Sequence, residues 1–156
     1  MSESPRVRFV KVTNLNSGRF EEIDFSADLM KYITGRPLTT EEAIRRYTFN
    51  MDHPYFGSYF VEEFKTDKIL GFAVIKEKGN FAEIGYMVLN SFKGNGLATV
   101  INKILIEICQ KHLHSYQICA FVDERNIASI RVLEKSGMNK SGVNQEEGIT
   151  SLQFLI

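Results

Sequence analysis

The sequence predicts an α/β fold, more exactly an α+β sandwich with a mixed, mostly antiparallel sheet and about four helices. Three β-rich runs separated by short turns follow one another between residues 57 and 90, as in an antiparallel meander. A segment with helical periodicity then leads into another strand-like run. Because a helix between two strands of one sheet makes a crossover connection, these two strands should be parallel.

Length, charge and composition limit the class of protein. The 156 residues, 44% of them hydrophobic, suffice for one core, so we expect a single domain over residues 1–156. Lys and Arg number 19 and so do Asp and Glu, which excludes a global field that would hold nucleic acid or an anionic membrane. No apolar run approaches the roughly 18 residues that span a bilayer, and the N-terminus lacks a signal pattern, so we expect a cytoplasmic protein. Cys109 and Cys119 are too few for a zinc site or a disulfide framework; we expect buried thiols and no metal.

The first part of the chain is predicted to be a strand followed by a helical region. Residues 6–13 alternate polar and apolar side chains, which is typical of a strand with one covered face. Thr39 stands three residues before Glu42, the spacing of a capping box, and predicts a helix that begins at Thr40. The acidic residues of this region either attract a cationic amine or form a solvated helix face; they are Glu21, Glu22, Asp24, Asp28, Glu41 and Glu42.

The meander has predicted strands at residues 57–64, 68–77 and 80–90, separated by KTD and EKG. An aromatic run at its start either walls a pocket or packs in the core; it consists of Tyr55, Phe56, Tyr59 and Phe60.

The stretch FKGNGLATVI, residues 92–101, has two interpretations. Asn95-Gly96 is a strong hairpin signal, whereas glycines before a helix expose backbone amides to an anion. A hairpin would need period-two alternation afterwards, and Asn102 instead falls on the polar face of a helix of about four turns. The first amides of that helix should be unpaired and favour negative charge. Its apolar face recurs every three or four residues and ends in a histidine expected to lie in the core or at its boundary: Leu97, Val100, Ile101, Ile104, Leu105, Ile108, Cys109 and His112.

A second strand–helix unit follows. Residues 115–123 form a buried-strand candidate, Asn126 is a good helix N-cap, and Gly137 suits the C′ position just past the helix end. The tail, residues 138–156, indicates two more strands around QEEG.

These motifs resemble those of a known family. EIGYMVLNSFKGNGLAT (residues 83–99), followed by NIASIRVLEKSGM (residues 126–138), resembles the acetyl-CoA-binding signature of GNAT-fold N-acetyltransferases. It is most similar to the branch that contains the ribosomal-protein N-acetyltransferases. The matching segment covers about a third of the chain. The resemblance implies the GNAT fold, with a central parallel strand pair that splays apart, and acetyl-CoA as cosubstrate.

The resemblance also implies where coenzyme A binds. Backbone amides of the glycine loop would cradle the pyrophosphate, with Gly94 and Gly96 allowing close approach; the alternative is a loop that only makes a tight turn. Unpaired backbone at the splayed strands would bind the pantetheine arm, and Asn126 would reach it or only cap its own helix. The implied cofactor-binding residues are Met87, Val88, Lys93, Gly94, Asn95, Gly96, Leu97, Ala98, Thr99, Asn126 and Ser129.

Catalysis needs a base and a partner for the departing sulfur. An alkyl ammonium with a pKa near 10.4 is only about one part in a thousand neutral at pH 7, so a carboxylate should lie near the amine. Glu83 is the candidate base, and the alternative is an edge glutamate in solvent. Many family members carry a tyrosine acid seven residues after the asparagine, where this chain has Leu133. Ser129 is the substitute that we expect, since the ribosomal-protein branch resembles this sequence in having serine there; it would orient or hydrogen-bond the sulfur.

Three functional classes remain. The leading one is an acetyl-CoA-dependent N-acetyltransferase that acts on a primary amine, either a protein N-terminus or a small amine, by direct nucleophilic attack. The second is a non-catalytic acyl-CoA-binding or sensor domain, because the usual tyrosine is missing. The third, a Rossmann-type nucleotide-binding domain, lacks the third glycine and the acidic residue about 20 positions on. We expect no nucleic-acid or membrane partner, and the oligomeric state is open between monomer and homodimer.

Overall fold

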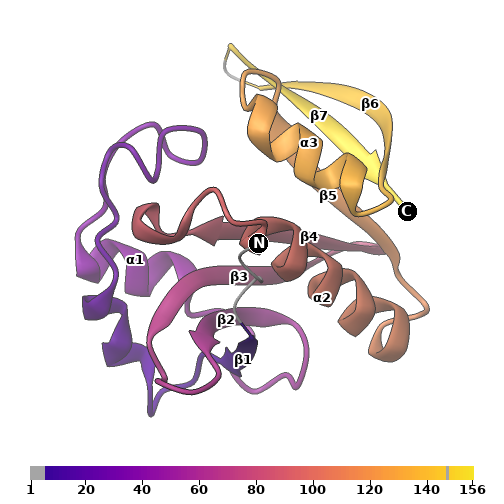
Figure 1. Cartoon of the computed structure of the whole chain (residues 1–156). Coiled ribbons are helices and arrows are strands. Elements are labelled where there is room, and N and C mark those ends of the chain that lie inside the picture. The colour runs from indigo at the N-terminus through magenta and orange to yellow at the C-terminus, as the bar shows by residue number, and fades with distance from the viewer. Residues whose placement is uncertain (1–5, 147) are drawn as a thin grey trace.

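The computed structural model describes residues 6–146 and 148–156 (Figure 1). The elements are β1 (Val7–Lys11), η1 (Ser17–Glu22), α1 (Thr40–Tyr47), β2 (Gly57–Glu63), β3 (Ile69–Lys78), β4 (Phe81–Val88), η2 (Asn90–Phe92), α2 (Leu97–His112), β5 (Gln117–Asp123), α3 (Ile127–Lys135), β6 (Asn139–Glu146) and β7 (Ile149–Leu155), where η denotes a 3₁₀ helix. The strands form one sheet in the order β1-β2-β3-β4-β5-β7-β6. Every neighbouring pair is antiparallel except β4 and β5, which confirms the predicted fold class.

Two predicted helix ends follow from local signals and are confirmed. At the start of α1 the Thr39 hydroxyl accepts a hydrogen bond from the Glu42 N–H at 3.1 Å, and the Glu42 carboxylate accepts one from the Thr39 N–H at 3.0 Å. At the end of α3, Gly137 has a φ of 89°. Its N–H donates to the Glu134 carbonyl at 3.0 Å, and the Met138 N–H donates to the Leu133 carbonyl at 3.1 Å, which is a Schellman motif.

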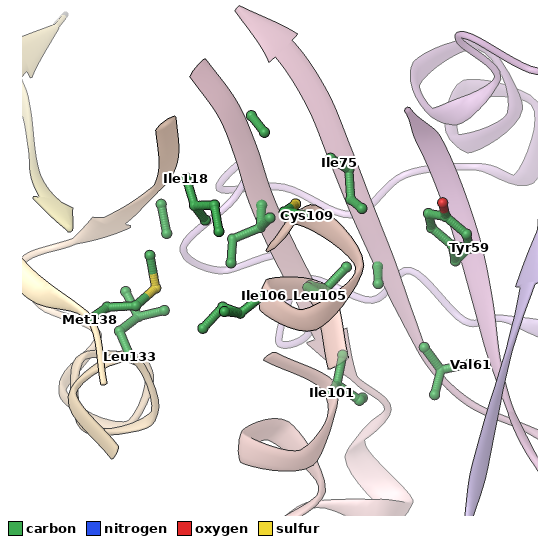
Figure 2. Close-up of a cluster of buried hydrophobic side chains, with 14 of the residues drawn as sticks. Tyr59, Val61, Ile75, Ile101, Leu105, Ile106, Cys109, Ile118, Leu133 and Met138 are labelled. Atoms are coloured by element: carbon green, nitrogen blue, oxygen red, sulfur yellow. The ribbon is translucent and has the colours of Figure 1, made fainter. Parts of the chain in front are cut away.

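Two hydrophobic clusters cover the two faces of the sheet, because successive strand side chains point to opposite sides. Tyr59 and Val61 of β2 belong to the cluster under α2 and α3, whereas Phe60 between them belongs to the cluster under η1 and α1. Figure 2 shows Leu105 and Cys109 of α2 over the strands in the first cluster. The predicted aromatic run therefore packs mainly as core: Phe56, Tyr59 and Phe60 are buried.

Two side chains of α2 differ from the periodicity prediction. Asn102, expected on the polar face, is fully buried, and its Nδ2 lies 3.8 Å from the Met138 sulfur, because α3 and Met138, three residues past its end, cover that side of the helix. His112, expected in the core or at its boundary, is exposed and stacks on Tyr55 with ring centroids 4.1 Å apart. Helix periodicity alone shows one covered face and cannot show which loop or second helix will pack on the other.

The parallel pairing between β4 and β5 is short. It joins Phe81 to Gln117, Ala82 to Ile118 and Glu83 to Cys119, and then ends. Beyond that point β4 stays paired with β3 and β5 with β7, so the two central strands diverge, as Figure 1 shows. Among the described residues, no helix has both the length and the apolar character needed to cross a membrane.

Candidate active site

Two cavities adjoin where β4 and β5 separate. The loop-side cavity, about 540 Å³, lies between the glycine loop, the start of α3 and the segment that precedes α1. The strand-side cavity, about 200 Å³, is bordered by α1 and by strands β3, β4 and β5. The residues that border both are Tyr32, Ile33, Tyr86, Met87, Asn126 and Ser129. A ligand in one cavity can therefore reach a ligand in the other.

The glycine loop enters α2 through two residues with left-handed backbone. Gly94 has a φ of 88° and Gly96, the N-cap of α2, a φ of 81°, conformations that strain any residue with a Cβ. A Cβ added to Gly94 would meet no protein atom within 4 Å, so open space lies in front of this glycine. The loop thus leaves the first amides and the positive dipole end of α2 beside the loop-side cavity. These features fit an anionic diphosphate group.

Most of the expected cofactor-binding residues lie together. Asn95 is the exception, since it does not border the loop-side cavity; its Oδ1 accepts a hydrogen bond from the Leu97 N–H at 3.3 Å. Asn95 therefore supports the conformation of the loop. The expected residues that do border this cavity are Met87, Val88, Lys93, Gly94, Gly96, Leu97, Ala98, Thr99, Asn126 and Ser129.

Ser129 has a hydroxyl neighbour that the sequence analysis missed. Its Oγ lies 2.8 Å from the Oη of Tyr86, while its N–H donates to the cap residue Asn126 at 3.2 Å. Burial raises the pKa of Tyr86 to about 12, although the hydrogen bond with Ser129 opposes the shift, so the phenol keeps its proton at neutral pH. The signal in the sequence was a tyrosine on the β4 face that also carries Ile84 and Val88.

Leu133 stands where many family members have a tyrosine, and it cannot donate a proton. The side chain is 2% exposed and belongs to the core cluster, although it also borders the strand-side cavity. Within the described chain, the hydroxyl groups that border both cavities are those of Tyr32, Tyr86 and Ser129.

Glu83 borders the strand-side cavity and not the loop-side one. Its side chain is 14% exposed, and Oε1 forms an ion pair with the Lys78 ammonium at 2.9 Å. This carboxylate raises the pKa of Lys78. Glu83 is the last residue of the β4–β5 ladder and stands opposite Lys76 across the β3–β4 ladder. The alternative of an edge glutamate in solvent is therefore wrong.

The acidic residues of the N-terminal region do not wall the strand-side cavity. None of the six borders it in the described chain, and Asp28 borders the loop-side cavity instead. Glu22 pairs with Arg19, and Glu42 pairs with Arg36. The expectation of a solvated helix face fits these positions better than a site for a cationic amine, and the structure adds the two ion pairs.

Residues 6–139 match the family model for the acetyltransferase (GNAT) domain. The chain belongs to the GNAT acetyltransferase family. Its mixed sheet with one central parallel pair is the GNAT fold that the sequence resemblance implied. The ribosomal-protein branch stays a prediction from the sequence.

Individual relatives agree with this family. The curated Probable N-acetyltransferase YjcK of Bacillus subtilis (strain 168) is 30% identical over 93 residues, which span 57% of this chain and 50% of that protein. The chain thus matches about half the length of this relative. An acetyltransferase (GNAT family) from Bacillus anthracis aligns with a TM-score of 0.79 at 21% identity, over 100% of this chain and 98% of its own. A spermidine N-acetyltransferase from Vibrio cholerae in complex with CoA and spermine aligns with a TM-score of 0.80 at 15% identity, over 96% and 94%. At these identities the structural matches show the fold.

Proposed function

We propose that this GNAT-family chain transfers the acetyl group of acetyl-CoA to a primary amine, either a protein N-terminus or a small amine, by direct attack of the amine. The observation that carries the proposal is that two cavities share a border where β4 and β5 separate. One has a lining suited to a diphosphate, and the other leaves room for an acceptor. The strand-side cavity is also bordered by groups that can donate or accept protons, namely Tyr86, Ser129 and Glu83.

The loop-side cavity would hold the coenzyme through this chain's backbone. Amides of the glycine loop and the start of α2 would bind the diphosphate, and Lys93 would add positive charge. Met87 and Val88 lie beyond the last β4–β5 pair, so backbone groups on that side of β4 can bind an extended chain that carries amides. Asn126 and Ser129 approach from the start of α3.

Bound acetyl-CoA would supply an acetyl thioester, whose carbonyl carbon forms a bond to the amine nitrogen while its bond to sulfur breaks. Backbone N–H groups of β4 would stabilise the charge that develops on the carbonyl oxygen. The Ser129 hydroxyl, with Tyr86 behind it, would donate a hydrogen bond to the departing sulfur. Glu83 would take the proton that the attacking ammonium must lose, directly or through water.

Coenzyme binding tests the proposal first. Isothermal titration of the purified chain with CoA should give saturable binding, and Gly94→Ala should weaken it about tenfold or more, because a Cβ would enter the space in front of the loop. Gly79→Ala is the matched control, since Gly79 also has a positive φ, 57°, and open surroundings, but it does not border the cavity. Absence of binding at millimolar CoA would refute the transferase proposal.

Turnover separates the leading function from its alternative. Thiol release from acetyl-CoA in the presence of peptides and small amines should exceed the release without an amine. CoA binding with no amine-dependent release would instead favour the non-catalytic acyl-CoA-binding or sensor domain, for which the apolar Leu133 is the supporting observation.

A further inference from the structure

The strand-side cavity is bordered by four charged side chains, each from a different element. Arg46 comes from α1, Lys76 from β3, Glu83 from β4 and Asp123 from β5. Their pairing determines which charge an acceptor would meet there.

Both carboxylates are already matched by cations that lie outside the cavity lining. Asp123 receives two hydrogen bonds from the Arg125 guanidinium, at 3.0 Å from Nε and 2.7 Å from Nη2, and Arg125 lowers its pKa. Glu83 pairs with Lys78 at 2.9 Å. These pairs leave little net negative charge facing the cavity.

The two cations lack such partners. In the described chain no carboxylate lies within 4.0 Å of the charged nitrogens of Arg46 or Lys76. Arg46, which is exposed, donates from Nε to the Tyr47 hydroxyl at 3.3 Å and lies over the Tyr47 ring, and neither contact supplies a negative charge. Burial lowers the pKa of Lys76, Glu83 raises it, and the positive charge of Arg46 lowers it further. The two cations are therefore near enough to repel each other, and an anion between them would relieve that repulsion.

From this charge arrangement we infer that the acceptor is an amine with an anionic group close to its reactive nitrogen. Lys76 and Arg46 would bind that anionic group. The inference rests on the proposed function, because it names the acceptor class of that reaction. Lys76 and Glu83 stand directly opposite each other in the β3–β4 ladder, so the anion site and the proposed base are adjacent. An amine with a nearby carboxylate would fit both the anion site and the proposed base. Such an acceptor is either a free amino acid, through its α-carboxylate, or a peptide with an acidic first residue, through its side chain. A polyamine would place a second cation against Lys76 and Arg46.

The test compares acceptors of different charge, with each anionic acceptor matched to its neutral amide. Initial rates of thiol release give kcat/KM for tripeptides that begin with Asp, Asn or Lys and are otherwise identical, for free alanine and its amide alaninamide, and for spermidine. The anionic member of each pair should be preferred about tenfold or more over its amide, the effect of one charge-assisted contact. Preference for the tripeptides or for the free amino acids identifies the source of the acceptor.

Variants assign the preference to the two cations. Lys76→Gln and Arg46→Gln should each reduce the ratio of kcat/KM between the anionic acceptor and its amide at least severalfold, and Lys76→Glu should favour the lysine peptide. Arg45→Gln is the matched control, since Arg45 is the exposed neighbour on α1 and does not border the cavity. It should keep the wild-type ratio.

The possible failures are distinct. If the chain binds CoA and acetylates neutral or cationic amines best, or acetylates none of the anionic ones, the acceptor inference is overturned and the coenzyme site stands. An unchanged ratio in Lys76→Gln and Arg46→Gln also overturns it. If the wild-type chain does not bind CoA, the proposed function is overturned, and the acceptor inference with it.

Discussion

The hydroxyl groups of Tyr86 and Ser129 lie 2.8 Å apart at the border of the two cavities, next to a core leucine where a tyrosine would be usual in the family. A serine hydroxyl alone is a very weak acid. In the proposed mechanism the phenol behind it, which keeps its proton because burial raises its pKa to about 12, would donate a hydrogen bond to Ser129 as Ser129 donates to sulfur. We propose that the pair, from β4 and α3 together, takes the place of the single tyrosine found in many family members.

Removal of the Ser129 hydroxyl should slow the chemical step. Ser129→Ala should lower kcat about tenfold or more, with a smaller change in the affinity for CoA. Tyr86→Phe should lower kcat by a smaller factor, and the double variant should lose less than the product of both, because the two groups act in series. Steady-state kinetics measure these values. Ser136→Ala is the control, since that hydroxyl bonds the Val132 carbonyl of the same helix at 2.7 Å. A kcat unchanged in Ser129→Ala would exclude the relay.

The role of Glu83 is tested by removing its charge and keeping its shape. If this carboxylate is the base, Glu83→Gln should lower kcat/KM about a hundredfold. Lys78→Met, which breaks the same ion pair from the other side, should have a smaller effect. Glu107→Gln, on the exposed face of α2, should behave as wild type. A small effect of Glu83→Gln would mean that water carries the proton.

At the scale of elements, the start of α1 depends on its capping box. Thr39→Ala should lower the free energy of unfolding by about 1 kcal/mol, because an amide at the first turn loses its acceptor. Urea denaturation measures this change, and Thr40→Ala, next to the cap, should change it less. An equal loss in both variants would contradict the assignment of the cap.

The same box makes part of the stability dependent on pH. The hydrogen bond from Arg36, with the one from the Thr39 N–H, lowers the pKa of Glu42 from 4.5 to about 2. A lowered pKa stabilises the fold above pH 4.5, and this contribution disappears as the pH falls toward 2. Glu42→Gln should therefore unfold with a weaker pH dependence in that window.

Elements that depend on neighbouring residues could be predicted from the sequence, whereas features that depend on distant residues could not. The cap at Thr39 and the stop at Gly137 involve hydrogen bonds within a few residues, so their spacing was sufficient. The burial of Asn102 depends on Met138, and the position of His112 depends on Tyr55, which are far away in the sequence. No periodicity within α2 contains that information.

The same distinction between local and distant residues holds for the candidate active site. The glycine loop could be found because its residues are consecutive and resemble a family motif. Tyr86 and Lys76 acquire their neighbours only through the register of the sheet and the position of α3, and Arg46 comes from a helix that faces them. The acceptor side of the site is therefore the part that the sequence left undefined.

The molecule as a whole should lose stability in alkali. Burial raises the pKa of Cys109 from 9.0 to about 12, of Cys119 from 9.0 to about 11, and of Tyr86 from 10.0 to about 12. Above pH 9 the unfolded chain loses these protons first, so it binds fewer protons than the fold, and stability falls as the pH rises through these values. The midpoint of urea unfolding should decrease as the pH rises from about 7 to 10.5. Cys109→Ala should make this dependence of the midpoint on pH weaker. Midpoints independent of pH would contradict this account.

The central ladder between β4 and β5 has three residue pairs, whereas the β3–β4 ladder beside it has eight. Packing of α2 against α3 also joins the two halves of the molecule, and Figure 2 shows Ile106 of α2 in the same cluster as Leu133 and Met138. An extended ligand that carries amides would occupy the place of a missing strand and connect the two halves of the sheet. If CoA binds there as proposed, deuterium uptake by the β4 and β5 amides should slow when CoA is added, because the bound coenzyme would protect the backbone where the strands diverge.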